Sequence, residues 1–438
     1  MKRRLVLHSL FIVLFFLAAG SLQAQYLWNS DSAYKAGTAN SGRIWGYVFG
    51  DFYYKGHSDS LNRGGNNQYT GIPQSRNAFQ FRRIYLGYDY NISEKFSAEL
   101  LLAAEDNFPA FNPPSSGVVS GDQLSNTKET FFIKLANVRW KNIWKGTDLI
   151  VGEQATPSFP LLTEKVWNYR SVERTIIDIR RTPSYDLGAG LQGKFDAKGN
   201  FGYDVLVANG TSDKPASNGF KWFYGDLFAY FLDKKLVVDL YGDYQRLNWQ
   251  PGWHHDRQMV KGFIAYTTPA LTVGVEGFVN TIRADVKATK IAGGADSINT
   301  VAEGISFYVH GNIIPGKLRF FARYDMYNPN NKVNNTLYSG YAGISGVNSP
   351  SGYNFPGYKM TFNPSTGAPA TATSTGDITA KENFITAGLD FTPVKNVHFM
   401  PNIWYNHYKT QLTGAAGAAN GPGYDLVYRA TFYFVFGK

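Results

Sequence analysis

The sequence of 438 residues contains no cysteine, which excludes disulfide bonds and thiolate-bound metals. Beyond the N-terminus, charged or polar residues recur every few positions. No apolar run there approaches the roughly 20 residues that a membrane-spanning helix needs, so a helical membrane protein is excluded. The sequence also lacks a Gly-x-Ser-x-Gly motif, a His-Glu-x-x-His motif and a phosphate-binding glycine loop.

Aromatic residues and glycine are abundant, whereas charged residues are few. The chain has 29 tyrosines, 32 phenylalanines and 45 glycines, and charged residues make up 17% of it. Aromatic side chains favour pleated strands and glycine favours turns and kinks, so this composition indicates an all-β protein. The mean hydropathy is −0.27. A membrane barrel can be hydrophilic on average because its lumen is polar and only its exterior is apolar.

The N-terminus has the pattern of a secretory signal peptide. Three basic residues (2–4) precede an apolar stretch (5–17), and the small-residue cleavage site Leu22-Gln23-Ala24 follows. The alternative, an uncleaved anchor, is disfavoured because about 13 apolar residues are short for a spanning helix. We expect a signal peptide at residues 1–24 and a periplasmic segment at 25–42. Removing the three basic residues lowers the formal charge from +10 to about +7, an excess that modestly favours anionic partners.

The rest of the sequence alternates apolar and polar residues with a period of two, which is typical of strands. The last segment is the clearest example, with an apolar face formed by Tyr424, Leu426, Tyr428, Ala430, Phe432, Phe434 and Phe436. Sixteen such segments are predicted: 43–54, 78–90, 95–105, 129–140, 147–155, 185–195, 201–210, 219–231, 235–247, 257–267, 270–282, 303–313, 317–328, 381–391, 396–409 and 424–437. A soluble β-sandwich would show the same alternation, so the alternation alone does not decide between the two.

Connection lengths separate the two architectures. Tight turns are predicted at 91–94, 196–200, 232–234, 267–269, 314–316 and 392–395. Long polar connections are predicted between them at 55–76, 106–128, 156–184, 248–256, 283–302, 329–380 and 410–423. Short periplasmic turns that alternate with long extracellular loops are typical of a transmembrane antiparallel β-barrel in the outer membrane of a Gram-negative-type bacterium. A barrel of about sixteen strands encloses an aqueous channel. The segment 329–380, rich in Asn, Gly, Ser, Thr and Pro, is predicted to be a flexible loop.

One stretch of the sequence resembles the phosphate-selective porin O/P family. The matching residues run from Leu149-Ile150-Val151-Gly152-Glu153-Gln154 through Val172-Glu173-Arg174-Thr175-Ile176-Ile177-Asp178 to Tyr185-Asp186-Leu187-Gly188-Ala189-Gly190-Leu191. A weaker match covers 82–88 and 96–100. The resemblance implies a sixteen-stranded homotrimeric porin whose third long loop folds into the lumen. Two features depart from the family: Ala155-Thr156 stands where a basic residue is common, and Gly437-Lys438 follows the C-terminal aromatic.

On this resemblance, the segment 156–184 is the constriction loop of the pore. Its cationic residues, which we take as anion-binding candidates, are Lys165, Arg170, Arg174, Arg180 and Arg181. Clustered Arg and Lys side chains along a water-filled path favour anions, and arginine can bind phosphate oxygens in a bidentate manner. The alternative is that these arginines pair with the acids of the same loop, or with the barrel wall, and only hold the loop in place.

The alternation also predicts which charged residues face the lumen. The basic ones are Arg83, Lys134, Arg319, Arg323 and Arg429. The acidic ones are Glu99, Glu105, Asp186, Asp226, Asp239, Asp243, Glu276 and Asp390. The predicted wall therefore carries both signs of charge, and it does not by itself indicate selectivity for phosphate.

The predicted function is passive diffusion of small hydrophilic solutes across the outer membrane, leaning toward anions such as phosphate, with surrounding lipids and no nucleic acid as partners. We expect no enzyme activity, no cofactor and no metal. His254-His255-Asp256 is read as a solvated loop tip because it offers too few ligands for a metal. The main alternative is a structural or adhesive barrel that binds a partner through its long loops. An outer-membrane hydrolase lacks a visible nucleophile and base, and a channel for hydrophobic solutes lacks apolar lumen positions.

Overall fold

The computed structural model describes residues 39–59, 63–64, 67–70, 72–105, 124–125, 128–129, 131–180, 183–216, 219–251, 253–334, 336–343, 380–409, 411 and 423–437. The predicted signal peptide, Arg181 and most of the segments 25–42 and 329–380 lie outside these residues. None of the helices in the described residues is long and apolar enough to cross a membrane.

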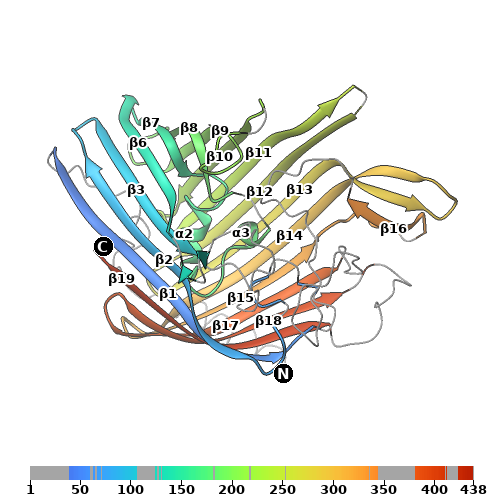
Figure 1. Ribbon diagram of the computed structural model, residues 1–438. Helices are drawn as coiled ribbons and strands as arrows, with labels where there is room; N and C mark the ends of the chain where they lie inside the picture. The colour runs from blue at the N-terminus through green and yellow to red at the C-terminus, as the bar shows by residue number, and fades with distance from the viewer. Residues whose placement is uncertain are drawn as a thin grey trace, which may run out of the picture.

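A closed antiparallel barrel forms most of the described chain (Figure 1). Its strands are β1 (Ser41–His57), β2 (Asn77–Asn91), β3 (Phe96–Glu105), β6 (Phe132–Trp144), β7 (Thr147–Ala155), β8 (Tyr185–Lys194), β9 (Phe201–Ala208), β10 (Trp222–Phe231), β11 (Leu236–Gln250), β12 (Trp253–Thr267), β13 (Leu271–Lys290), β14 (Ala295–Ile314), β15 (Leu318–Asn328), β17 (Lys381–Val394), β18 (Val397–Lys409) and β19 (Tyr424–Phe436). Each strand pairs with the next one along the chain, and β1 closes the ring by pairing with β19. The prediction of a sixteen-stranded barrel is confirmed.

Two of the predicted long loops are wrong, because strands continue through them. Strand β11 ends at Gln250 and strand β12 begins at Trp253, so the loop expected at 248–256 is mostly strand. The loop expected at 283–302 is the far half of the β13–β14 hairpin, which turns at Gly293 and Gly294, both with positive φ. A further strand, β16 (Tyr338–Gly343), pairs with β13 there and makes an arm that projects from the barrel (Figure 1). The polar residues of this arm suggested a loop, although the period of two persists through them.

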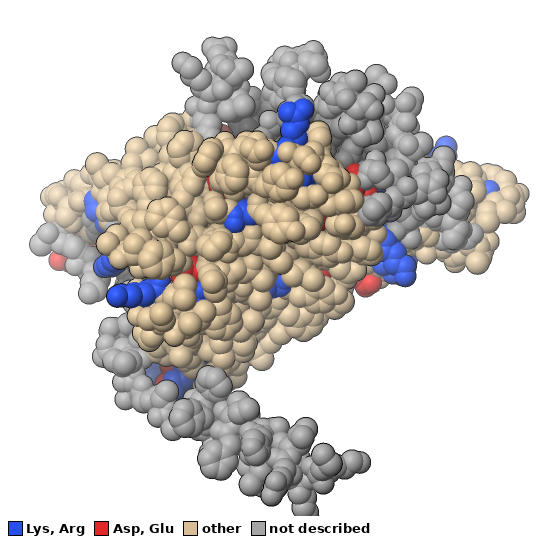
Figure 2. Space-filling model, turned by 90° about the horizontal axis from the view of Figure 1, so that it is seen from below, with Lys and Arg blue, Asp and Glu red and all other residues tan. Residues whose placement is uncertain are grey.

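The barrel exterior is apolar. Outward side chains around the barrel, such as Leu227 of β10, Leu240 of β11, Val260 of β12 and Phe399 of β18, are half exposed. Figure 2 shows one face of the exterior, on which charged side chains are sparse. A closed barrel leaves no unpaired strand edge, so its backbone polar groups are satisfied within lipid. An apolar band of this kind faces the hydrocarbon core of a membrane, and the fold and exterior are those of an outer-membrane barrel.

Two β-bulges change which residues face inward. In β2 the pairing with β1 skips Arg82, and in β6 the pairing with β3 skips Lys134. An extra residue in one strand shifts the alternation by one position. As a result Arg82 and Arg83 both point inward and are buried, and Lys134 is buried beside the equally buried Leu135.

Residues 156–180 of the predicted 156–184 loop lie inside the ring of strands and carry two short helices, α2 (Thr163–Trp167) and α3 (Ile176–Ile179) (Figure 1). One apolar cluster joins Phe159, Ile176 and Ile177 of this segment to inward aromatic side chains of β10, β11 and β13. A second cluster joins Val166 and Trp167 to side chains of β12, β14 and β15. The loop is therefore packed against the inner wall by apolar contacts as well as by polar ones.

A charged residue introduced on the barrel exterior tests whether these outward side chains face lipid. Leu240→Arg, near the middle of the wall, is expected to destabilise the folded barrel by about 2–4 kcal/mol, because the cation would enter the hydrocarbon core. Leu232→Arg, in the turn between β10 and β11, is the matched control and is expected to cost about 0–1 kcal/mol. The measurement is an equilibrium folding titration into lipid vesicles in denaturant. Equal losses in the two variants would contradict the assignment of the lipid face.

Candidate functional site

Lys261 of β12 anchors the beginning of the 156–184 loop. Its ammonium group donates to the backbone oxygen of Ser158 at 2.7 Å and pairs with the Asp239 carboxylate of β11 at 2.6 Å. Lys261 and Asp239 are both almost fully buried. A buried lysine is stable only when it is paired and hydrogen-bonded. Lys261 therefore neutralises the Asp239 carboxylate of the wall, and its hydrogen bond to Ser158 holds the loop backbone in place.

The middle of the loop is held by further polar contacts with the wall. His310 Nε2 of β14 lies 3.0 Å from the backbone oxygen of Val166. The Tyr169 hydroxyl donates to the Asp390 carboxylate of β17 at 3.2 Å. Together with the Lys261 contact, these two contacts attach the loop to strands β12, β14 and β17.

Three arginines of the wall converge on the turn formed by residues 171–174. Arg82 of β2 donates to the backbone oxygens of Ser171 and Val172 at 3.2 and 2.9 Å. Arg429 of β19 donates to the same Val172 oxygen at 2.9 Å, and Arg323 of β15 donates to the backbone oxygen of Arg174. Buried carbonyl groups need donors, and here the barrel wall supplies them.

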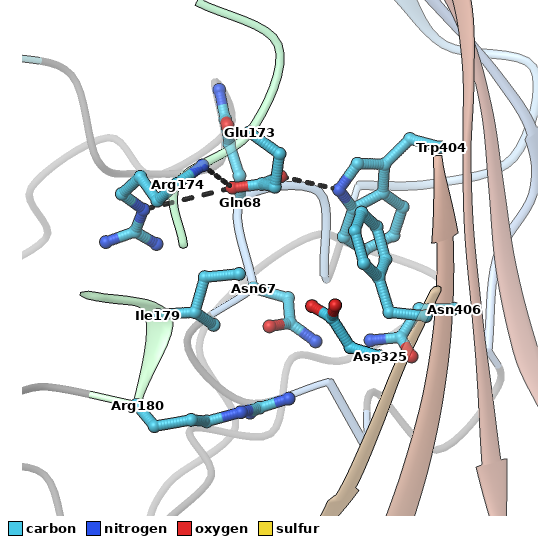
Figure 3. Close-up of a pocket in the computed structure, with 10 residues that line it drawn as sticks. Asn67, Gln68, Glu173, Arg174, Ile179, Arg180, Asp325, Trp404 and Asn406 are labelled. Atoms are coloured by element: carbon cyan, nitrogen blue, oxygen red, sulfur yellow. Dashed lines mark hydrogen bonds and ion pairs between the residues drawn. The ribbon is translucent and has the colours of Figure 1, made fainter. Parts of the chain in front are cut away.

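Glu173 stands at the centre of this turn and is 2% exposed. Its carboxylate accepts from Trp404 Nε1 of β18 at 2.7 Å and from the backbone N–H of Arg174 at 3.0 Å (Figure 3). Burial of the carboxyl group would raise its pKa, but nearby guanidinium groups outweigh burial and lower the pKa of Glu173 below its ordinary value. These groups belong to Arg82, Arg174, Arg429 and Arg323. Glu173 is therefore a carboxylate at neutral pH.

A narrow recess opens beside this turn between the loop and the wall (Figure 3). Its lining residues come from the β1–β2 connection, the loop, β15, β17 and β18, and are Asn67, Gln68, Glu173, Arg174, Ile179, Arg180, Asp325, Phe384, Trp404 and Asn406. The side chains leave free room for about a single water molecule. The seam between loop and wall is thus closely packed, and it carries two arginines and two carboxylates.

The other predicted cations of the loop also have acidic neighbours. Arg170 pairs within the loop, with Glu164 and, at 2.9 Å, with Asp178. Arg180 forms a two-pronged pair with Glu382 of β17 at 2.9 and 3.2 Å, and its guanidinium lies 3.7 Å from the centre of the Tyr327 ring.

Arg174 lies 3.9 Å from each of the Glu173 and Asp178 carboxylates. Lys165, half-buried on α2, contributes positive charge near Asp204 of β9. Arg181 lies outside the described residues.

The predicted cations of the wall fall into three groups. Arg83 and Lys134 both approach Glu105 of β3, Arg83 at 3.5 Å. Arg319 contacts the His310 imidazole at 3.0 Å, near Tyr169 of the loop. The remaining two, Arg323 and Arg429, reach the 171–174 turn. Arg323 also pairs with Asp325 at 2.8 Å, and Arg429 donates to the Asn402 amide oxygen at 2.7 Å.

The sequence reasoning missed Arg82, which contacts the loop more closely than Arg83 does. A strict period of two gives adjacent residues opposite faces, so only one arginine of the pair was placed in the lumen. The sequence nevertheless contains a sign that both arginines face the lumen. Phe79 and Phe81 occupy odd positions and face outward, whereas the outward residues after the arginine pair are Ile84 and Leu86, at even positions. Such a change of parity marks a bulge.

Buried charges of both signs line the wall. The arginines that hold the turn come from β2, β15 and β19. Buried carboxylates gather on β8–β13, namely Asp186, Asp204, Asp226, Asp239, Asp243 and Glu276. Lys261 is embedded among these acids. Buried acids also lie on the arginine-bearing side of the wall, namely Asp51 of β1, Asp325 of β15, Glu382 and Asp390 of β17, and Asp425 of β19, so both signs of charge occur on each side of the loop.

The interpretation of His254-His255-Asp256 as a solvated loop tip is wrong in part. These residues belong to β12, and His255 and Asp256 are buried. His255 lies 3.4 Å from the Asp285 carboxylate, and Asp256 pairs with Arg283 at 3.2 Å. Within the described residues, no group of three His, Asp or Glu side chains is arranged to hold a metal ion.

No family model matches the sequence, and no curated protein matches it either. Several solved structures share the fold. The chain superposes on outer-membrane expressed OmpT of Vibrio cholerae with a TM-score of 0.50 at 9% identity, covering 91% of this chain and 99% of that one. For OmpF of Salmonella typhi, solved with daunomycin, the TM-score is 0.50 at 11% identity, with 90% and 98% covered. For the outer membrane channel DcaP of Acinetobacter baumannii it is 0.51 at 9% identity, with 91% and 98% covered. The chain therefore has the porin fold.

The Lys261–Asp239 pair provides a test of how the loop is anchored. Lys261→Met leaves a buried carboxylate without its cation and is expected to cost about 3–5 kcal/mol of folding free energy. Lys261→Met/Asp239→Asn removes both charges and is expected to recover most of that loss, because an apolar or neutral pair needs no desolvated ions. Folding titrations in vesicles measure both variants. A double variant as unstable as the single one would show that the pair is not the cause.

Proposed function

We propose that the protein is an outer-membrane channel for the passive diffusion of small hydrophilic solutes. The observation that carries this proposal is a polar loop folded across a lumen whose wall is also polar and charged. A barrel of this width encloses water, and a loop held inside it narrows the path without adding any catalytic group. We also propose that the barrel assembles as a homotrimer, as the resemblance to phosphate-selective porins implies.

An anion preference is the narrower part of the proposal. It is supported by the arginines around the 171–174 turn and by Arg180 in the adjoining recess. It is opposed by the carboxylates on β8–β13 and by the close pairing of Arg170 and Arg180 with loop and wall acids. We therefore propose a modest preference for anions, with phosphate among the solutes, in place of a dedicated phosphate filter.

The proposal predicts ion conductance when the purified protein is inserted into a planar bilayer. In a salt gradient, the reversal potential of the wild type is expected to indicate a modest preference for chloride over potassium. Arg170→Ala/Arg174→Ala is expected to shift the chloride-to-potassium permeability ratio toward potassium by about sevenfold for each positive charge removed, because a unit charge at roughly 7 Å in water changes the energy of each ion by about RT, in opposite directions for the two ions.

Arg283→Ala is the matched control, because that arginine is 52% exposed on the β13 arm and pairs with Asp256. Its reversal potential is expected to equal that of the wild type. Absence of conductance would refute the channel itself, whereas a preference for potassium in the wild type would refute only the anion preference.

A further inference from the structure

The connection between β1 and β2 also enters the lumen. Its described residues are 58–59, 63–64, 67–70 and 72–76. Tyr69 is fully buried and Ile72 is 1% exposed, and Asn67, Gln68 and Thr70 are buried as well. Loops usually run over the surface of a protein, because a buried loop carries backbone polar groups that need partners. Burial of this connection therefore requires partners from the barrel wall.

The wall offers the connection an apolar seat. Tyr69 and Ile72 belong to one apolar cluster with inward side chains of β1, β17, β18 and β19. The centre of the Tyr69 ring lies 5.5 Å from the centres of both the Tyr53 ring of β1 and the Trp404 ring of β18. The Tyr69 hydroxyl donates to the Asp51 carboxylate of β1 at 2.9 Å. All of these wall side chains face the lumen, so the connection is held inside the barrel.

Lys55 of β1 anchors the connection in the way that Lys261 anchors the 156–184 loop. The Lys55 ammonium group donates to the backbone oxygen of Tyr69 at 2.6 Å and pairs with the Asp425 carboxylate of β19 at 2.6 Å. Lys55 and Asp425 are both almost fully buried. In each anchor a buried lysine, paired with an aspartate of the adjacent strand, holds a backbone oxygen of an inward segment. The wall is therefore built to hold two segments.

The connection and the loop share wall partners. Glu382 of β17 accepts from the Asn67 amide at 2.7 Å and from Arg180 of the loop at 2.9 Å. Arg429 of β19 lies 3.4 Å from the Tyr69 hydroxyl and also donates to the loop. Asn67 and Gln68 line the narrow recess beside the loop, which has room for about one water molecule (Figure 3). The connection and the loop therefore close this part of the lumen together.

Both segments enter from the same end of the barrel, because β1 and β7 are the first and fifth strands of an antiparallel ring. The diameter of a pore limits the size of the solutes that pass it. We propose that the β1–β2 connection is a second constriction element of the channel, and that its turn at 67–70 sets the upper size of the solutes that pass. This inference rests on the proposed channel function. It concerns the width of the path and not its charge.

The experiment measures the entry of uncharged sugars of increasing size into vesicles that contain Tyr69→Ala/Ile72→Ala. The two substitutions remove the side chains that seat the connection and leave every wall residue unchanged. The variant is expected to admit larger sugars than the wild type does. Its single-channel conductance is expected to rise by about twofold, because two parallel water-filled paths of equal width conduct twice as much as one.

Ile291→Ala/Leu337→Ala is the matched control. Ile291 and Leu337 lie on the arm that projects from the barrel, and they are 60% and 56% exposed. This variant removes apolar side chains of similar kind outside the lumen, so its size limit is expected to equal that of the wild type. A wild-type size limit in folded Tyr69→Ala/Ile72→Ala, or the same increase in the control, would show that the inference is wrong. If the wild type passes neither sugars nor ions, the proposed function fails instead.

A charge-balanced variant covers the case in which Tyr69→Ala/Ile72→Ala does not fold. Lys55→Met/Asp425→Asn removes the donor to the Tyr69 backbone oxygen and leaves no buried ion without its partner. It is also expected to admit larger sugars than the wild type does. A folded Lys55→Met/Asp425→Asn variant with the size limit of the wild type would overturn the inference without any reference to Tyr69→Ala/Ile72→Ala.

Discussion

The contact between the loop carbonyl groups and the arginines of the wall is the interaction on which the interior of this barrel depends. A loop that crosses the lumen without regular strand pairing has backbone oxygens with no backbone partner. Once the loop is packed against the wall, water no longer reaches these oxygens, so they need donors from the protein. Arg82, Arg323 and Arg429 supply donors to the turn at 171–174. The helices α2 and α3 and the apolar clusters beside them can pack against the wall because that turn is fixed.

The membrane makes the strands predictable from the sequence and leaves the interior hard to predict. In 424–436 every second residue must be apolar because it faces lipid, and the pattern gave this strand within one residue at each end. Strand segments that extend out of the membrane need no apolar residue at every second position. The far half of the β13–β14 hairpin is polar, and its strand pairing with β16 depends on a segment some fifty residues further along the chain.

The candidate site could be predicted only as a set of residues, because its geometry depends on contacts between distant strands. Inward parity placed Arg323 and Arg429 in the lumen, but nothing in their neighbourhoods indicates that both reach the same turn of the loop. Arg180 and Glu382 are 202 residues apart in the sequence. The bulge that turns Arg82 inward is visible as a change of parity, yet its contact with Val172 follows only from the folded barrel.

The charges of the interior reconcile two requirements that oppose each other. Selectivity for anions calls for uncompensated arginines along the path, whereas folding calls for each buried charge to be compensated. Four guanidinium groups gathered without an anion would repel one another and lower the stability of the empty barrel. The fixed carboxylates of Asp51, Glu173, Asp178 and Asp325 compensate these arginines before any solute arrives. The same carboxylates reduce the positive potential that a passing anion would meet, so a wall rich in arginine need not make a strongly anion-selective channel.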